Sequence, residues 1–337
     1  MIASENRALT DLISDRDSKP FFSIEFFPPK SQNGIVLLDT VVDELKRINP
    51  LFVDVTWGAG GSTSELTFDI CKNIKETHNL TTNIHLTCTN MKIETIDDTL
   101  AKMKNVGLKN ILALRGDPPV GQEWVAMDGG LTCALDLINY IKNKYENYFH
   151  ISCAGYPEGH PLSMTNKPFD SMTVEEKARC YEEINEDGAN SYYVCTDENY
   201  ENELNYLKKK VDAGAKCIIT QMFFDTSVFT YFVKKCRDYG INVPIIPGLM
   251  LIQNYSGFKR MIKFCKTRVP YDLLEKVESL KDDEEKFKEY GIEFGIAMCK
   301  ELLSEGVVGL HFYTLNQSEA TLKIASALLG TTPILQN

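Results

Sequence analysis

The sequence predicts an α/β fold, a single (β/α)₈ TIM barrel built from parallel strand–helix units. Eight short apolar segments rich in β-branched and aromatic residues recur along the 337 residues, and stretches with helical apolar spacing separate them. Strands and helices that alternate in this way form parallel sheets, and eight strands close a barrel. The expected strands cover 21–27, 51–57, 82–88, 110–116, 149–155, 216–224, 243–249 and 307–315.

Two stretches, 161–200 and 267–290, interrupt the regular alternation and are predicted to be insertions that carry helices. A doubly wound sheet is the rival architecture, but no G-x-G-x-x-G motif follows the first strand, so the phosphate turn of a Rossmann fold is missing. No low-complexity linker or internal repeat marks a second domain. We expect an N-terminal extension at 1–20, one catalytic barrel at 21–330 and a C-terminal tail at 331–337.

The charge balance and the cysteines limit the class of protein. With 36 Lys+Arg against 47 Asp+Glu, most of the surface would repel a phosphate backbone, so nucleic acid is not an expected partner. The ten cysteines form no CxxC pair and stand mostly in apolar runs, which is typical of buried thiols in a reducing compartment. We find no signal peptide or membrane-length apolar run and expect a cytoplasmic protein without membrane association, while a homo-oligomer stays open.

Polar residues stand within or directly after nearly every expected strand, where an ordinary core strand has no need of them. In a closed barrel these strand ends converge on one face, the face on which barrel active sites are built. The sequence therefore predicts an active site there. Its candidate residues are Glu25, Thr56, His85, Arg115, Asp117, Tyr156, His160, Gln221, Tyr313 and Asn316.

Glu25 is the candidate proton donor. It is flanked by Ile24, Phe26 and Phe27, and a carboxyl group in apolar surroundings resists ionisation. Its pKa would then rise into the range useful for a general acid. The alternative is a buried carboxylate that pairs with a neighbouring lysine or arginine for stability, and the residues alone leave both interpretations open.

The histidines raise the question of a metal. His85 alternates with Ile84 and Leu86, so a hydrogen-bonded core histidine is one interpretation. Together with His160 it could also indicate a metal site. No third ligand appears at ligand spacing, so we predict no metal. The GYPEGHP segment at 155–161 suits a shaped binding loop or an ordinary turn.

Eight motifs occur in order along the chain. They are FSIEFFPPK (22–30), DVTWGAGG (54–61), HLTCTNM (85–91), NILALRGDPP (110–119), AGYPEGHP (154–161), GAKCIITQMFFD (214–225), PIIPGL (244–249) and GLHFYTLN (309–316). Together they resemble methylenetetrahydrofolate reductase. The resemblance runs from about residue 20 to residue 330 and is closer to the eukaryotic catalytic module than to the bacterial forms; we expect no S-adenosylmethionine-binding regulatory domain in this chain.

This resemblance implies an FAD enzyme that works by a ping-pong mechanism. NADH or NADPH would reduce the flavin and leave before folate enters the same face. Hydride would then pass to 5,10-methylenetetrahydrofolate and give 5-methyltetrahydrofolate. The alternative from a different class is a flavin- or folate-binding barrel without turnover, which would serve as a regulatory or assembly subunit.

The resemblance also assigns residues. Glu25 matches the general acid, Asp117 matches a residue that hydrogen-bonds the pterin close to the flavin, and Gln221 matches a further pterin contact. The family positions for flavin contact fall on Thr56, Trp57, His85, Arg115, Gly116, Asp117, Cys133, Ala134, Tyr156, His160, Glu203 and Lys210. Those for the folate and nicotinamide substrates fall on Glu25, Phe26, Phe27, Lys30, Asp117, Gln221, Tyr313 and Gln317.

Four features depart from the family pattern. Cys133 stands where many members have a tyrosine beside the flavin, and Glu203 stands where they have aspartate. Gln317 stands where an arginine is usual, so one charge contact with the folate tail is not expected here. The stretch 161–200 is also longer than the corresponding link in the family.

Overall fold

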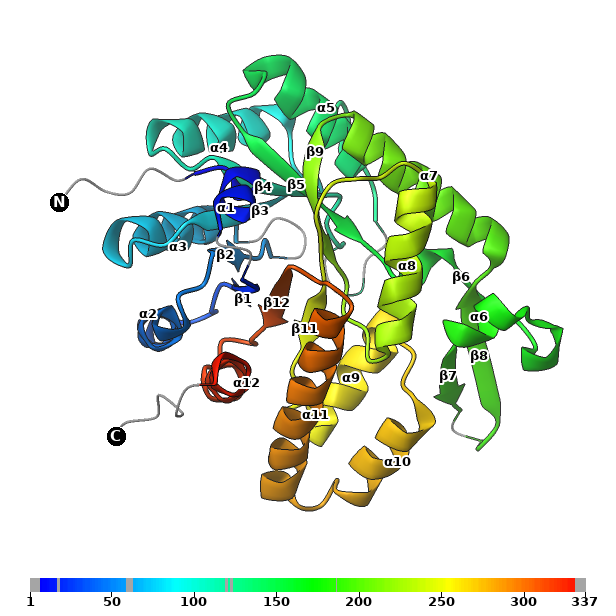
Figure 1. Cartoon of the computed structure of the whole chain (residues 1–337). Helices are drawn as coiled ribbons and strands as arrows, with labels where there is room; N and C mark the ends of the chain where they lie inside the picture. The colour runs from blue at the N-terminus through cyan, green and yellow to red at the C-terminus, as the bar shows by residue number, and fades with distance from the viewer. Residues whose placement is uncertain are drawn as a thin grey trace.

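The computed structural model describes residues 7–16, 19–58, 63–118, 121, 124–185 and 187–330. Within them a nine-stranded parallel sheet curls into a barrel that helices surround (Figure 1), which confirms the predicted (β/α)₈ fold. The strands of the sheet are β1 (Phe21–Phe26), β2 (Phe52–Val55), β3 (Thr82–Thr87), β4 (Asn110–Leu114), β5 (His150–Gly155), β9 (Ala215–Thr220), β10 (Ile245–Ile246), β11 (Gly248–Met250) and β12 (Gly309–Tyr313).

The barrel closes through a strand that is broken in two. The segment predicted as one strand at 243–249 forms β10 and β11, which are separated by Pro247. Proline has no N–H to donate to a sheet ladder, so it interrupts the strand. β10 pairs with β9, and β11 pairs with β12, so one short segment joins the two ends of the sheet. The carbonyl of Pro247 accepts a hydrogen bond from the backbone N–H of His311 (3.0 Å) at this joint.

Helices cover the outside of the barrel because the strands alternate their side chains. Ile24 and Phe26 of β1 point outward and belong to one apolar core with Leu38 and Val42 of a helix. None of the described helices has the length and apolar composition needed to cross a membrane. The helices of the shell are α2 (Gln32–Leu45), α3 (Ser64–Thr77), α4 (Ile93–Asn105), α5 (Ala134–Tyr145), α7 (Asp197–Asp212), α8 (Thr226–Asp238), α9 (Tyr255–Cys265), α11 (Glu284–Ser304) and α12 (Glu319–Leu329), with the short 3₁₀ turn η1 (Lys46–Ile48) after α2.

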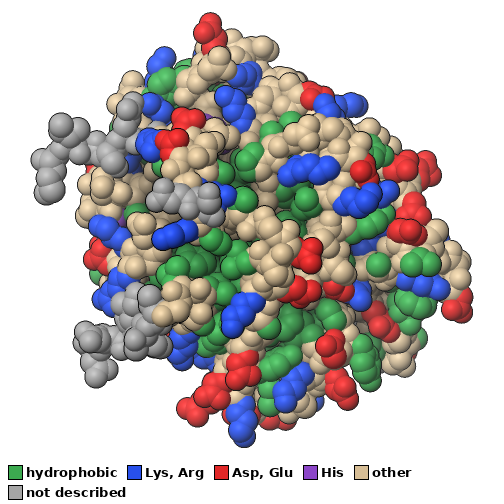
Figure 2. All heavy atoms as spheres, viewed as in Figure 1, with side chains coloured by type: hydrophobic (Ala, Val, Ile, Leu, Met, Phe, Trp, Pro, Cys, Tyr) green, Lys and Arg blue, Asp and Glu red, His purple; other side chains and the backbone are tan. Residues whose placement is uncertain are grey.

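The outer faces of these helices are charged. Figure 2 shows basic and acidic side chains interspersed over the face in view. This distribution is typical of amphipathic helices whose apolar side faces a sheet and whose polar side faces water.

The first predicted insertion, 161–200, is present but contains more sheet than expected. It carries one short helix, α6 (Val174–Ala178), and the start of α7, as predicted. Its main element is a three-stranded antiparallel sheet that lies at the side of the barrel (Figure 1) and that the sequence analysis did not predict. The remaining elements are β6 (Met164–Asn166), β7 (Tyr181–Ile184), β8 (Asn190–Cys195) and the 3₁₀ turns η3 (Pro161–Ser163) and η4 (Phe169–Ser171).

The second insertion, 267–290, is helical as predicted. It contains α10 (Tyr271–Ser279) and the first residues of α11, which continues as a 21-residue helix of the barrel shell.

The segment predicted as an N-terminal extension carries a helix, α1 (Leu9–Asp15), at the bottom of the barrel. Leu9 is fully buried against Phe21, Phe52 and Leu112. Its backbone N–H donates to Oδ1 of Asn110 (3.1 Å). The helix therefore closes the N-terminal end of the barrel; the predicted tail at 331–337 lies outside the described residues.

Above this apolar bottom, the barrel interior is polar. Nδ2 of Asn83 on β3 donates to Oγ of Ser152 on β5 (3.3 Å), and because these strands are not neighbours the bond crosses the interior. Branched apolar residues usually fill this position in TIM barrels. The polar layer thus forms the floor beneath the C-terminal mouth. Its members, all fully buried, are Ser23, Asp54, Asn83, Ser152 and His311.

Candidate active site

Glu25 and Tyr313 lie side by side at the C-terminal mouth of the barrel, where β1 pairs with β12. The pKa of the Tyr313 phenol is raised well above its ordinary value, mainly by burial and further by the negative charges of Glu25 and Asp54. Its hydroxyl donates to the carbonyl of Thr220 on β9 (2.5 Å). A neutral phenol therefore spans the mouth beside Glu25.

Asp117 and Tyr156 lie at the same rim. Asp117 is exposed after β4, and Tyr156 follows β5. Burial is the main cause that raises the pKa of Tyr156, and the charge of Asp117 adds to it. Tyr156 in turn contributes to the raised pKa of Tyr313 beside Glu25. The acid from the first strand and the carboxylate that follows the fourth strand therefore face one mouth.

Two histidines surround the carboxylate of Glu25. Its Oε2 lies 3.5 Å from Nε2 of His85 and 3.4 Å from Nε2 of His311. The sequence suggested apolar surroundings or a lysine or arginine partner. The structure differs from both, because Ile24 and Phe26 point to the opposite side of β1 and imidazoles from β3 and β12 fill the space instead. The Glu25 side chain is 17% exposed, so it can also reach a ligand.

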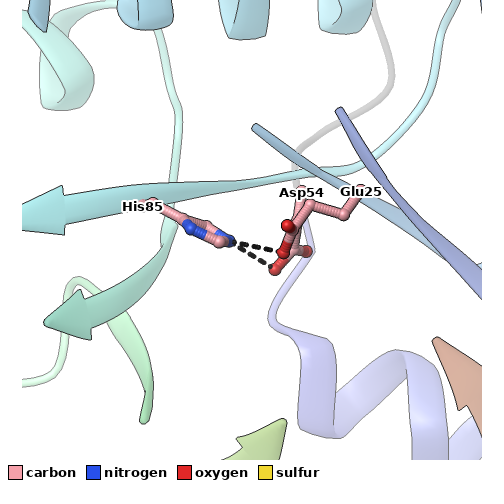
Figure 3. Close-up of side chains that lie close together, drawn as sticks. All are labelled: Glu25, Asp54 and His85. Atoms are coloured by element: carbon pink, nitrogen blue, oxygen red, sulfur yellow. Dashed lines mark hydrogen bonds and ion pairs between the residues drawn. The ribbon is translucent and has the colours of Figure 1, made fainter. Parts of the chain in front are cut away.

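His85 joins Glu25 to a buried aspartate (Figure 3). Its Nε2 lies 3.0 Å from Oδ2 of Asp54, which also accepts from Nδ2 of Asn83 (3.0 Å). Burial alone would lower the pKa of His85. The hydrogen bond with Asp54 and the charges of Glu25 and Asp54 outweigh it, so the pKa is raised. Sequence reasoning missed Asp54, whose only signal was one acid inside the apolar strand LFVDVTW.

The same three residues could approach one metal ion. The ligand atoms of Glu25, Asp54 and His85 all lie within 4.8 Å of one another. The sequence argument against a metal used the lack of a third ligand, and that premise is wrong. A protonated Nε2 that donates to Asp54 has no lone pair for a metal, however. The raised pKa of His85 therefore favours a cluster that holds protons.

His311, the second partner of Glu25, is fully buried and its Nδ1 lies 2.9 Å from Oγ of Ser23. Sequence reasoning also missed this pair. The sequence did hold a signal, because residues at every second position face the same side of a strand. Polar residues occupy such positions in both strands, Ser23 and Glu25 in β1 and His311 and Tyr313 in β12.

The turn after β4 is tightly built. Gly116 has φ +89°, and a Cβ there would lie 2.7 Å from Cβ of Thr87, so only glycine fits. The carbonyl of Arg115 accepts from the backbone N–H of Thr89 (3.0 Å). The Arg115 guanidinium lies 5.2 Å from the ring centre of Trp124, in a cation–π contact. Arg115 and Gly116, both predicted flavin contacts, are thus fixed at the mouth.

The GYPEGHP segment forms a loop whose aromatic rings contact each other. The rings of Tyr156 and His160 lie 4.6 Å apart with an edge-to-face orientation. Nδ1 of His160 accepts from the backbone N–H of Leu162 (3.1 Å). Burial, with the nearby charges of Arg115 and Lys210, lowers the pKa of His160 to about 4. The imidazole is therefore neutral at neutral pH.

Lys210 and Glu203 line one small pocket beside β5. The Lys210 ammonium is buried and donates to the carbonyl of Ala154 (2.8 Å). Glu203 accepts from the hydroxyl of Ser163. Cys133 and Ala134 form the start of α5, where Cys133 is half-buried and Ala134 is buried.

The residues predicted to bind the substrates do not all lie at the barrel mouth. Gln221 is half-buried after β9, and its Oε1 accepts from the backbone N–H of Met222 (2.9 Å). Phe27, Lys30 and Gln317 are exposed near the ends of β1 and β12.

Phe26 is separate from this group. It is 1% exposed and faces the helix side of β1, so its side chain does not share the mouth with Glu25. Asn316 secures the end of β1 by donating from Nδ2 to the carbonyl of Phe27 (2.8 Å).

Two predicted flavin residues follow β2. Thr56 is half-buried, and its carbonyl accepts from the hydroxyl of Thr67 (3.0 Å). Trp57 is buried, and its indole Nε1 has no hydrogen-bond partner in the described part of the chain.

The chain is similar to known proteins in sequence and in fold. The sequence pattern of the methylenetetrahydrofolate reductase family matches residues 10–329. The chain is 47% identical over 304 residues to methylenetetrahydrofolate reductase (NADH) 1 of Arabidopsis thaliana, a match that covers 90% of this chain and 47% of that protein. It is 32% identical to 5,10-methylenetetrahydrofolate reductase of Escherichia coli, over 97% of this chain and 96% of that protein. The chain thus spans about half the length of the plant relative.

A solved structure has the same fold. It is described as an uncharacterized protein from Clostridium thermocellum that binds two copies of 5-methyl-5,6,7,8-tetrahydrofolic acid. The match has a TM-score of 0.57 with 12% sequence identity and covers 95% of this chain and 97% of that one, so it supports the fold alone. On the family match and the identities, this chain belongs to the methylenetetrahydrofolate reductase family.

Proposed function

We propose that this protein reduces 5,10-methylenetetrahydrofolate to 5-methyltetrahydrofolate, with FAD as its cofactor and NADH or NADPH as the reductant. Membership of the family supports the reaction. The names of two relatives support either nucleotide, because one is given as an NADH enzyme and one, from Caenorhabditis elegans, as an NADPH enzyme. The observation that carries the proposal is the carboxylate of Glu25 at the barrel mouth, within 3.5 Å of two imidazoles.

The residues at the mouth fit a flavin. The buried indole N–H of Trp57 and the buried hydroxyl of Thr87 have no partner among the described residues, so each is available to a polar edge. The close packing of Gly116 against Thr87 fixes the turn that carries Arg115. Arg115, held against Trp124, supplies a fixed positive charge for an anionic group. When bound there, FAD would carry hydride between the nicotinamide nucleotide and the folate.

Glu25 would donate the proton that the reaction requires. Opening of the imidazolidine ring of the folate converts a ring nitrogen into an amine, and that nitrogen must gain a proton. Glu25 is exposed enough to reach the substrate and has His85 and His311 behind it. Asp117, exposed at the same rim, would accept hydrogen bonds from the pterin N–H groups, and Gln221, directly after β9, would orient the pterin.

We further propose a cytoplasmic location and no resident metal. All ten cysteines are described; nine are buried and none is in a disulfide, which supports a reducing compartment. The raised pKa of His85 and its 3.0 Å contact with Asp54 support a site without a metal.

Two measurements test this function. The purified protein should show a flavin absorption spectrum, or gain one with added FAD, and NAD(P)H should bleach it under anaerobic conditions. Glu25→Gln should keep both properties while folate reduction falls by roughly 10²–10⁴-fold, the usual contribution of general acid catalysis. Glu94→Gln, an exposed carboxylate on α4, is the matched control and should behave as wild type. A protein that stays colourless with FAD, or a Glu25→Gln variant with full folate turnover, would refute the proposal.

A further inference from the structure

Asp54 is an unusual residue for the interior of a barrel. Its side chain is fully buried on β2, and in the described part of the chain no lysine or arginine forms an ion pair with it. Its hydrogen-bond partners there are His85 and Asn83. A buried carboxylate is costly unless an opposite charge or several donors compensate it. Asn83 is neutral, so the compensating charge has to come from His85.

Two thiols and a phenol near this cluster are held neutral by burial. Cys71 of α3 and Cys217 of β9 lie close to Asp54, and burial keeps the pKa of both thiols high. Tyr313 of β12 is also neutral because burial raises its pKa. His311 faces Glu25 from β12.

The charge on His85 matters to Glu25 because of the distances. Nε2 of His85 is 3.0 Å from Asp54 and 3.5 Å from Glu25, so one imidazole contacts both carboxylates (Figure 3). An imidazolium at this distance favours the ionised form of a neighbouring carboxyl group.

We propose that Asp54 is a positioning residue that keeps His85 protonated next to Glu25 and thereby sets the pH range over which Glu25 can deliver its proton. The inference rests on the proposed function for the role of Glu25, whereas the effect of Asp54 on His85 is a property of the protein alone. Asp54 does not touch the substrate in this scheme.

The substitution Asp54→Asn tests the proposal because it keeps the shape of the side chain and removes its charge. Without that charge, burial dominates and the pKa of His85 should fall. The neutral imidazole then stabilises the Glu25 carboxylate less. The alkaline limb of the pH profile for folate reduction should therefore move to higher pH by about one unit, while the pH profile for flavin reduction by NAD(P)H stays in place.

The ionisation of His85 can be measured directly in the flavin-free protein. NMR of ¹³C,¹⁵N-histidine-labelled protein, with the signal assigned from His85→Asn, should show that the His85 imidazole keeps its proton to higher pH in wild type than in Asp54→Asn. Asp97→Asn is the matched control, because it also removes a carboxylate that accepts from a neighbour but lies on the outer shell, where it pairs with Lys144. It should change neither the His85 signal nor the pH profile.

A double variant tests whether Asp54 acts through His85 or whether Asp54→Asn disturbs the site in some other way. In a His85→Asn background, Asp54→Asn should no longer move the alkaline limb to higher pH, because a shift in that direction passes through His85. An unchanged His85 signal in Asp54→Asn, or an equal shift of the limb with His85 already removed, would overturn the proposal. If wild type reduces no folate at all, the function proposed above fails together with the role in proton delivery, and the NMR result still decides whether Asp54 controls His85.

Discussion

Glu158 makes the stability of this protein depend on pH in a way that one substitution should remove. It lies in the 155–161 loop and is 5% exposed. Its Oε2 accepts from the backbone N–H of Arg268 (2.9 Å), and its Oε1 has no partner among the described residues. Burial raises the pKa of this carboxyl from 4.5 to about 8, against the opposing effects of the bond from Arg268 and its charge. The folded protein therefore holds a proton on Glu158 at neutral pH.

The expected size of the effect follows from these two pKa values. Below pH 4.5 the carboxyl is protonated in both the folded and the unfolded chain, so its ionisation does not change the free energy of unfolding. Between pH 4.5 and about 8 the unfolded chain loses the proton and the folded chain keeps it, so the free energy of unfolding decreases as pH rises. At about 1.4 kcal/mol per pH unit, the loss reaches ~5 kcal/mol near pH 8. Glu158→Gln keeps an acceptor for Arg268 and cannot ionise.

Urea denaturation of wild type and Glu158→Gln at pH 5 and pH 8 measures this directly. The difference in the free energy of unfolding between the two proteins should grow in favour of the variant by several kcal/mol from pH 5 to pH 8, because all other titrations cancel. The exposed Glu175→Gln on α6 should run parallel to wild type at both pH values. A Glu158→Gln variant that also runs parallel would show that the buried carboxyl is not protonated and would refute the reasoning.

Three further outcomes are expected. Gly159→Ala should destabilise the protein by roughly 2 kcal/mol or more, since φ is +91° and the new Cβ would lie 2.3 Å from Cβ of Cys195; a wild-type urea midpoint would contradict this. Phe26→Ala should lower the free energy of unfolding by about 3–5 kcal/mol and leave the KM for folate unchanged, and a raised KM with normal stability would place Phe26 in the site after all. In the flavin-free protein the NMR signals of His160 should report protonation only near pH 4, and an ordinary titration near pH 6.5 would contradict its burial.

The barrel itself could be predicted because its signal is local. Each strand is a short apolar run that alternates with an amphipathic helix, and seven of the eight predicted strands appear as single strands of the sheet. The break at Pro247 could also have been predicted, because proline interrupts the hydrogen bonds between neighbouring strands. The sheet that contains β6 and β8 could not be predicted, because β6 has only three residues and the apolar run YYVC of β8 stands alone between polar, mostly exposed segments.

The site could be predicted only in outline. The polar residues at the strand ends came from position alone, and the barrel brings Glu25 and Tyr313 together as neighbours. The partners of Glu25 depend on the register between strands that are distant in sequence, so a single acid in β2 gave no indication that Asp54 would bond His85. Phe26 was included because a whole segment was transferred from the family, although alternation along β1 directs it to the opposite side from Glu25.

The division of the seventh strand into β10 and β11 leaves short strand pairings at the place where the barrel closes. β10 offers two residues and β11 three, so few backbone bonds hold the wall where it meets β9 and β12. The amide of Gly248 bonds the hydroxyl of Thr220, whose carbonyl also holds Tyr313. Separation of the strands at this joint would therefore release the phenol that spans the entrance, so a local opening here would also widen the entrance.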